Sequence, residues 1–252
     1  MLDAHTHKEF EKAVVRSQHT QRNWDLDQKI PKEDLKSLLH AVTNCPSKQN
    51  IAFYKVHFVQ DRDMIEEIHE HTYGFSSYQG NRGTPPVYDP NEKRITETNP
   101  QTLANLLVIF EEHDFTEDLK NDLHRNQATR EFVMNGKLSP SKKEELIRDR
   151  NIALGIAAGY LNLTAALMGY RTGCCQCGDF EKIREIALLE NTPLLLMGVG
   201  FPQKGVNRKK HHIRDFTFIS KKKQPIKYKI WDYKNGNGKI IFRSSRRSRI
   251  YY

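Results

Sequence analysis

Apolar residues recur at helical spacing in two segments near the start of the chain, 7–23 and 31–44. Pro31 opens the second segment and is followed by Lys32, Glu33 and Asp34, which suits the first turn of a helix. A turn-rich break follows at 44–50, and residues 54–59 then have the β-branched and aromatic character of a strand. The opening pattern predicts two helices, a loop and a strand.

The rest of the chain alternates further helices with short apolar strands. Residues 103–110 and 193–199 are continuous apolar runs of strand length, which is typical of strands covered on both faces. Residues 74–100 collect Gly, Pro, Ser and Asn without periodicity and predict a surface excursion. Short helices are predicted at 61–71 and 180–189, and a buried central helix is predicted from Ile152 to Met168. The charged stretch 116–150 predicts one or two solvated helices.

This order of elements predicts an α+β fold. After Pro225, a strand-like run at 228–231 precedes the turn residues 235–238, which favours a hairpin or an arm. We therefore divide the chain into a domain at 1–216, with excursions at 74–100 and 111–150, and a C-terminal arm at 217–252.

Positive charge is concentrated at the C-terminus. The chain has 40 Lys and Arg against 31 Asp and Glu, but residues 203–252 hold 16 of the basic residues and only Asp215 and Asp232. Residues 1–202 therefore carry a net charge of −5, from 24 basic and 29 acidic residues. Nucleic-acid binding is thus a question about the arm alone, where cations alternate with aromatic residues.

Motifs for metals and membranes are weak. His5 and His7 lie in an Asp-x-His-x-His start that lacks a preceding strand, so we interpret it as a solvated terminus. Cys174-Cys175-x-Cys177 lacks a fourth ligand and favours small packed residues, with thiol chemistry as the minor alternative. The most apolar window, 152–170, is interrupted by polar residues and glycines, unlike a membrane span. With no signal-peptide pattern and no disulfide layout, we expect a cytoplasmic protein.

Several short motifs occur in an order that resembles the FMN-dependent nitroreductase family. The run from His19 to Trp24 resembles the family's Arg-Ser-x-Arg-x-Phe opening, and 45–50 resembles its Ala-Pro-Ser-x-x-Asn turn. Residues 156–173 are similar to its long central helix, Cys177-Gly178 falls at its Glu-Gly or Gly-Gly turn, and 193–202 resembles its Pro-x-x-x-x-x-Val-Gly-x-Pro strand. The resemblance covers about residues 8–215 and rests on the ordered set.

The resemblance implies a nitroreductase-like sheet, mixed or antiparallel and flanked by helices, with FMN at a homodimer interface. It implies that Thr20 and Arg22, with Arg208, Lys209 and Lys210, hold the phosphate and the electron-rich edge of the flavin. Pro46, Ser47 and Asn50 would line the ring, and the turn at Cys177-Gly178 would present a backbone N–H to the flavin N5. Gln18 stands where the family usually has a phosphate-binding Arg, and Lys48 or His19 would compensate.

The activity implied is that of an NAD(P)H oxidoreductase. NADH or NADPH would deliver hydride to flavin N5, and a nitroaromatic, a quinone or a similar acceptor would take two electrons. No protein side chain is required as a catalytic acid. The alternative from another class is a flavin fold that has lost FMN and acts as a basic-tailed nucleic-acid-binding or scaffold protein. For the arm itself, we expect a clasp on a second subunit rather than a grip on nucleic acid.

Overall fold

The computed structural model describes residues 3–74, 76–78, 94–96, 98–113, 137–215, 217–218, 223, 226, 229–234 and 237–243. The chain forms two compact units, Met1–Phe218 and Ile219–Tyr252. The first unit holds the α-helices α1 (Ala4–Ser17), α2 (Lys32–Thr43), α3 (Arg62–Glu70), α6 (Pro140–Leu167) and α7 (Phe180–Ile186), and the 3-10 helices η1 (Lys48–Asn50) and η2 (Pro100–Thr102). Its strands are β1 (Tyr54–Val59), β2 (Ser76–Tyr78), β3 (Arg94–Thr96), β4 (Leu106–Glu112), β5 (Arg171–Cys175) and β6 (Pro193–Gly200).

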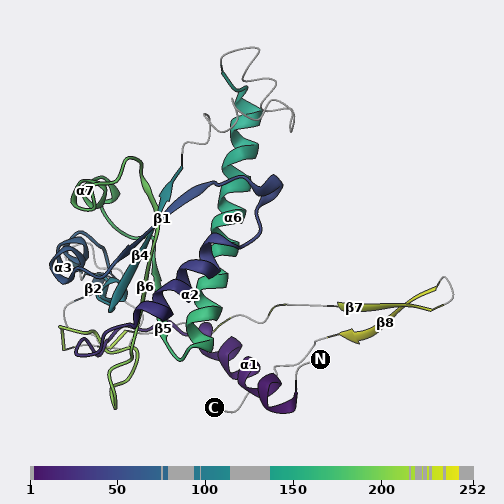
Figure 1. Cartoon of the computed structure of the whole chain (residues 1–252), viewed down its shortest axis with the longest axis horizontal. Helices are drawn as coiled ribbons and strands as arrows, with labels where there is room; N and C mark the ends of the chain where they lie inside the picture. The colour runs from purple at the N-terminus through teal and green to yellow at the C-terminus, as the bar shows by residue number, and fades with distance from the viewer. Residues whose placement is uncertain are drawn as a thin grey trace. The chain divides into compact units, whose positions relative to one another are not determined.

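A four-stranded antiparallel sheet forms the centre of the first unit, in the order β1-β4-β6-β5. Helices α2 and α6 cover one face and α3 and α7 cover the other (Figure 1). Strand β4 shows why its sequence is apolar throughout: Leu106, Val108 and Phe110 pack toward α2 and α6, while Leu107 and Ile109 pack toward α3 and α7. The predicted α+β fold with helices flanking a sheet is confirmed, and the sheet is antiparallel.

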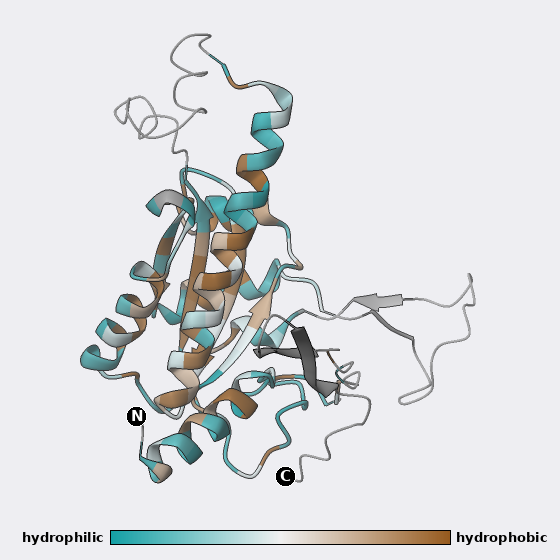
Figure 2. Cartoon of the chain, turned by 90° about the vertical axis from the view of Figure 1, so that its right-hand side faces the viewer, coloured by the Kyte–Doolittle hydropathy of each residue, from teal (hydrophilic) through white to brown (hydrophobic). Residues whose placement is uncertain are grey.

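Helix α6 is one continuous element, which corrects the division predicted near residue 151. The charged residues 140–150 and the apolar residues that follow belong to the same 28-residue helix. The helix is continuous because the stretch 140–151 contains no Gly, and its only Pro stands at the helix start, where it is tolerated. The composition changes along α6 because the surroundings of the helix change. Figure 2 shows this change along α6, from a hydrophilic first part to turns that are mostly apolar or neutral.

Two further predictions need correction. The first helix ends at Ser17 rather than near residue 23, and residues 20–24 instead run beside β5 and β6 through bridges from Thr20 to Thr172 and from Trp24 to Pro202. The segment around Cys174, interpreted as a tight connection, is strand β5, paired in register with β6. The strands at 54–59 and 193–199 and the helices at 61–71 and 180–189 are found with small shifts of their ends.

The second unit contains an antiparallel hairpin of β7 (Lys229–Lys234) and β8 (Asn237–Arg243), with an irregularity between Ile230 and Trp231. This confirms the hairpin alternative for the tail. Of the charged stretch 116–150, residues 116–136 lie outside the described residues, as does most of the excursion at 74–100.

Candidate functional site

The segment after α1 is held between β5 and the loop that follows β6. The N–H of Gln21 donates to the Thr172 carbonyl (2.8 Å), and the N–H of Arg22 donates to the Arg208 carbonyl (3.0 Å). The Arg208 Nη1 donates in turn to the Thr20 carbonyl (3.0 Å). The predicted site residues 19–22 and 208 therefore lie together, although nearly 190 residues separate them along the chain.

Four arginines and a histidine make up the cationic cluster of this region, which consists of Arg16, His19, Arg22, Arg171 and Arg208. Burial lowers the pKa of His19, Arg22 and Arg171, and the charge of Arg208 lowers each of them further. For Arg22 the pKa falls to about 10. Among the described residues, no carboxylate forms an ion pair with any of the four arginines.

Several donors of the cationic cluster are buried without a partner. Arg22 Nε and Arg171 Nη1 are out of solvent and form no hydrogen bond with the described part of the chain. Such groups lose several kcal/mol of hydration unless an acceptor replaces the water. Buried guanidinium groups that repel one another and lack acceptors fit the phosphate of FMN, a dianion with three terminal oxygen acceptors.

Arg22 lies deeper than the other members of the cationic cluster. Its side chain is 7% exposed, and its guanidinium carbon lies 4.7 Å from the centre of the Phe218 ring. With its amide oriented to satisfy both groups, Gln101 accepts from Arg22 Nη2 (3.3 Å) and donates to the Cys174 carbonyl. Gly173 permits this approach, since a Cβ there would lie 2.9 Å from the Gln101 side chain and from the Gln21 carbonyl. These contacts fix the position of the Arg22 guanidinium, so its positive charge can face the electron-rich edge of a bound flavin ring.

The turn at Cys177-Gly178 is tied to the end of α3. The N–H of Tyr73 donates to the Cys177 carbonyl (2.9 Å), and the N–H of Asp179 donates to the His71 carbonyl (2.9 Å). These two bonds flank an antiparallel bridge between Thr72 and Gly178. In that arrangement the N–H of Gly178 points away from Thr72, so it does not bond to the segment around Thr72 and can donate to another group.

The thiols beside this turn are not poised for redox or metal chemistry. Burial raises the pKa of Cys174 to about 11, and burial also raises the pKa of Cys175, so both stay protonated near neutral pH. All four cysteines are free, and no group of His, Cys, Asp or Glu in the described residues is arranged to hold a metal. Of the three cysteines, Cys175 is buried as the packing interpretation expects, whereas Cys174 and Cys177 are exposed.

The predicted segment Pro46–Asn50 lies elsewhere in the unit. Lys48 Nζ binds Asp149 (2.7 Å) and Glu145 (2.8 Å) in the first part of α6, whereas Arg16 donates to the Ala166 carbonyl (2.9 Å) near the end of that helix. At 1.5 Å per residue, the 17 residues between Asp149 and Ala166 span roughly 25 Å. One chain therefore does not bring Pro46, Ser47, Lys48 and Asn50 to the cationic cluster.

Two predicted basic residues lie at the edge of the cationic cluster. The carbonyl of Lys209 accepts from the N–H of Phe218 (2.8 Å), and Lys210 Nζ lies 3.7 Å from Asp215 on an exposed turn. Sequence reasoning missed Arg16, Gln101 and Arg171. The signal that could have found Arg171 is its position two residues after Gly169, which has φ 92°, at the start of a strand that was not predicted.

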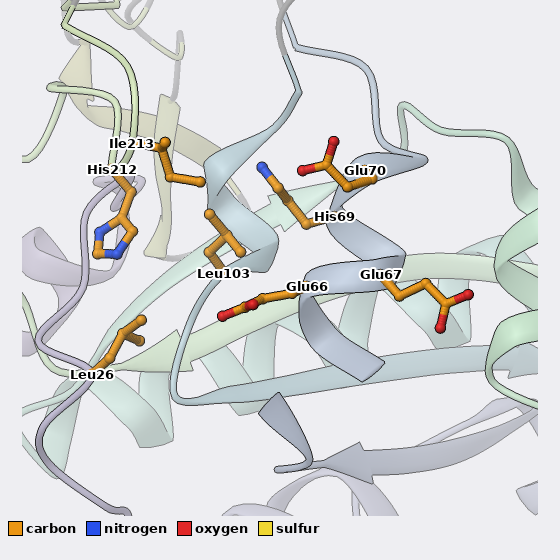
Figure 3. Close-up of a pocket in the computed structure, with 8 residues that line it drawn as sticks. All are labelled: Leu26, Glu66, Glu67, His69, Glu70, Leu103, His212 and Ile213. Atoms are coloured by element: carbon orange, nitrogen blue, oxygen red, sulfur yellow. The ribbon is translucent and has the colours of Figure 1, made fainter. Parts of the chain in front are cut away.

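A separate hollow of about 430 Å³ lies between α3, η2 and the loop after β6. Leu26, Leu103 and Ile213 supply apolar surface, and Glu66, Glu67 and Glu70 supply negative charge; Glu66 extends toward Leu103, while Glu67 points the opposite way (Figure 3). Its acidic residues would repel a phosphate. This hollow is therefore the wrong place for FMN.

The comparison with protein-family models decides the family. The model described as the nitroreductase family matches residues 15–201, about three quarters of the chain. The chain belongs to the nitroreductase family. The matched range holds β5, the Cys177-Gly178 turn and all members of the cationic cluster except Arg208.

Solved structures of nitroreductases share the fold at low sequence identity. A Bacillus subtilis protein assigned as a nitroreductase has a TM-score of 0.58 at 17% identity, with 87% of this chain and 96% of that chain covered. A protein from Exiguobacterium sibiricum, assigned as a nitroreductase and solved in complex with FMN, has a TM-score of 0.53 at 17% identity, with coverages of 81% and 92%. A protein from Staphylococcus epidermidis, assigned as an NAD(P)H:FMN oxidoreductase, has a TM-score of 0.52 at 18% identity, with coverages of 85% and 92%. No curated protein matches the chain.

No helix in the described part of this nitroreductase-family chain is both long and apolar enough to cross a membrane.

Proposed function

We propose that this chain is an FMN-dependent NAD(P)H oxidoreductase of the nitroreductase type, and that it works as a homodimer. The observation that carries the proposal is the cationic cluster, whose buried guanidinium groups have no acidic partner in the described chain. Arg22, Arg171 and Arg208 would bind the flavin, and the N–H of Gly178 would face its ring. FMN bound there would supply hydride transfer through its N5 between NADH or NADPH and a nitroaromatic, quinone or similar acceptor.

An exposed apolar stripe on α6 supports the homodimer. Ile152 is 56% exposed, Tyr160 46% and Leu167 52%, and the three lie on one face of the helix with Gly155 and Gly159 between them. A Cβ added to either glycine would meet nothing within 4 Å, so packing within the chain does not require glycine there. Each glycine destabilises a helix by about 1 kcal/mol relative to alanine. We therefore infer that Gly155 and Gly159 allow the backbone of a second copy to approach closely.

The stripe also explains how the distant segment Pro46–Asn50 can reach the flavin. If two copies of α6 pack antiparallel about a twofold axis midway between Gly155 and Gly159, Asp149 of one copy lies opposite Ala165 of the other. Lys48 binds Asp149, and Arg16 binds the Ala166 carbonyl. The pairing therefore places 46–50 of one copy beside the cationic cluster of the second.

The half-reactions can be tested separately. The chain is loaded with FMN, and its flavin absorbance is followed without oxygen after NADH or NADPH is added, then after a quinone or a nitroaromatic is added. We expect the absorbance to bleach with one of the two donors and to recover with the acceptor. The variant Arg184→Gln, on α7, where Arg184 pairs with Glu181, is the matched control and should behave as the wild type. Bound FMN that neither donor bleaches would contradict the proposed activity.

A further inference from the structure

Arg171 stands out among the members of the cationic cluster because its side chain has no hydrogen bond or ion pair with the described residues at the buried Nη1. It opens β5, two residues after Gly169, and pairs with Gly200 through the backbone. Strand β5 is an edge of the sheet, and the segment around Thr20 lies beside it through a bridge to Thr172. Its Nη1 is buried without a partner in the described residues.

The neighbours of Arg171 make its charge unfavourable in the unliganded chain. Burial lowers the pKa of Arg171, and the charges of Arg16 and Arg208 lower it further. Within the described residues, Arg16 and Arg208 themselves donate to backbone carbonyls, those of Ala166 and Thr20. A structural arginine would be expected to bind a carboxylate or carbonyl group, as Arg16 and Arg208 do for one nitrogen each. Arg171 Nη1 has no such acceptor among the described residues.

We propose that Arg171 binds the terminal phosphate of FMN together with Arg208 and thereby selects FMN over riboflavin. The inference rests on the proposed function and adds a specificity residue to it. A phosphate monoester offers three acceptor oxygens and up to two negative charges, and the planar fork of an arginine can bind two of those oxygens at once. Riboflavin has the same ring and ribityl chain but no phosphate, so it gains nothing from Arg171.

The experiment compares two ligands on the wild type and three variants. FMN and riboflavin are titrated into the full-length wild type, Arg171→Gln and Arg184→Gln, with flavin fluorescence as the readout. We expect Arg171→Gln to weaken FMN binding by roughly ten- to a hundredfold, since it removes a hydrogen-bonded charge pair, and to leave riboflavin binding unchanged. Arg184 lies on α7, paired with Glu181, and its replacement should alter neither ligand. Arg171→Lys should bind FMN with an intermediate affinity, because it keeps the charge and loses the fork.

Thermal unfolding without flavin separates ligand binding from a structural role. We expect unliganded Arg171→Gln to melt at or above the wild-type temperature, because the substitution removes a repelled charge. Equal weakening of both ligands, unchanged FMN affinity, or a lowered melting temperature in the unliganded variant would each overturn the inference. A wild type that binds neither flavin would instead overturn the proposed function.

Discussion

Arg22 is the residue whose chemistry is most constrained by its surroundings. Its guanidinium lies over Phe218, binds Gln101 through Nη2 and leaves Nε buried without a partner in the described chain. The sequence predicted Arg22, Thr20 and Arg208 as neighbours of one ligand from the order of motifs, and the structure brings these three together. Arg171 could not be predicted in the same way, because its role depends on the strand β5, which the glycines and cysteines around it concealed.

Arg22→Ala should weaken FMN binding by roughly ten- to a hundredfold, because a charge-assisted contact contributes about 1.5–3 kcal/mol. Fluorescence titration at moderate salt measures the change. Arg184→Ala, on α7, is the control, and it should bind FMN as the wild type does. An unchanged affinity in Arg22→Ala would remove Arg22 from the site.

Two buried histidines beside the site should make stability depend on pH. Burial lowers the pKa of His69 and of His211 to about 4, each from an ordinary value of 6.5. His69 stays neutral with Nδ1 at 3.1 Å from the Asn99 carbonyl and Nε2 at 2.8 Å from the Thr98 hydroxyl. Because the unfolded chain binds protons that these folded histidines reject, their contribution to stability is complete above about pH 6.5 and is lost progressively down to about pH 4.

We therefore expect the free energy of unfolding to fall as the pH drops from 6.5 to 4, by at most about 1.4 kcal/mol per pH unit for each histidine. Urea unfolding at several pH values measures the slope. His69→Gln should reduce the slope, while His7→Gln, on the exposed side of α1, removes a histidine away from this network. Equal slopes in the wild type and in His69→Gln would show that His69 is not responsible.

At the scale of elements, prediction succeeded where one pattern covers a whole element. The apolar runs that became β4 and β6 and the helix α3 could be predicted because burial on both faces or on one stripe leaves a clear periodicity. The sequence pattern divided α6 into two helices because the polarity of its residues changes along it, whereas its backbone is helical from Pro140 to Leu167. Strand β5 was missed because Gly173 fits against Gln101, a contact that only the tertiary structure reveals.

Helix α7 ends at a strained residue. Leu188 has φ 52° and is 86% exposed, and the N–H of Leu189 donates to the Arg184 carbonyl (3.0 Å), as in a Schellman ending. Glycine adopts this left-handed conformation without the penalty that a Cβ brings. Leu188→Gly should therefore raise the free energy of unfolding by about 0.5–1 kcal/mol, which urea unfolding measures.

The matched control uses the same substitution in a right-handed position. Leu39 in α2 is 43% exposed, and Leu39→Gly should lower the free energy of unfolding by about 1 kcal/mol. If both variants were destabilised equally, the left-handed conformation of Leu188 would not be a source of strain.

At the scale of the whole molecule, charge divides the chain at the boundary between the two units. Residues 219–252 hold 11 Lys and Arg against one Asp, a net charge of +10, while residues 1–218 hold 29 basic and 30 acidic residues, a net charge of −1. The family match ends before this second unit begins. The exposed Ile226, at 73%, is one apolar residue of this unit that a second subunit could cover.

Deleting residues 219–252 tests the clasp. If the arm holds a second subunit, the deletion should weaken the dimer and reduce flavin retention with little dependence on salt, because the lost contribution is apolar burial. Sedimentation, flavin content and oligonucleotide binding are measured on both chains. An intact flavin-containing dimer that loses only oligonucleotide affinity, with a steep salt dependence, would instead assign the arm to nucleic acid.

The α6 stripe makes its own prediction about assembly. Gly159→Leu should convert a dimer to monomers, because the added side chain would stand where a second backbone packs. Sedimentation velocity measures the change. Lys143→Leu, on an exposed turn outside the stripe, is the control and should remain dimeric. A Gly159→Leu variant that sediments as the wild type would place the interface elsewhere.

The most direct test of the account is a titration of the purified full-length chain, freed of any bound flavin, with FMN. The cationic cluster predicts saturable binding of one FMN per chain, seen as quenching of flavin fluorescence, and a yellow protein after gel filtration. A chain that stays colourless and leaves flavin fluorescence unchanged in excess FMN would contradict the claim that the cationic cluster, with Arg22, Arg171 and Arg208, forms a flavin site.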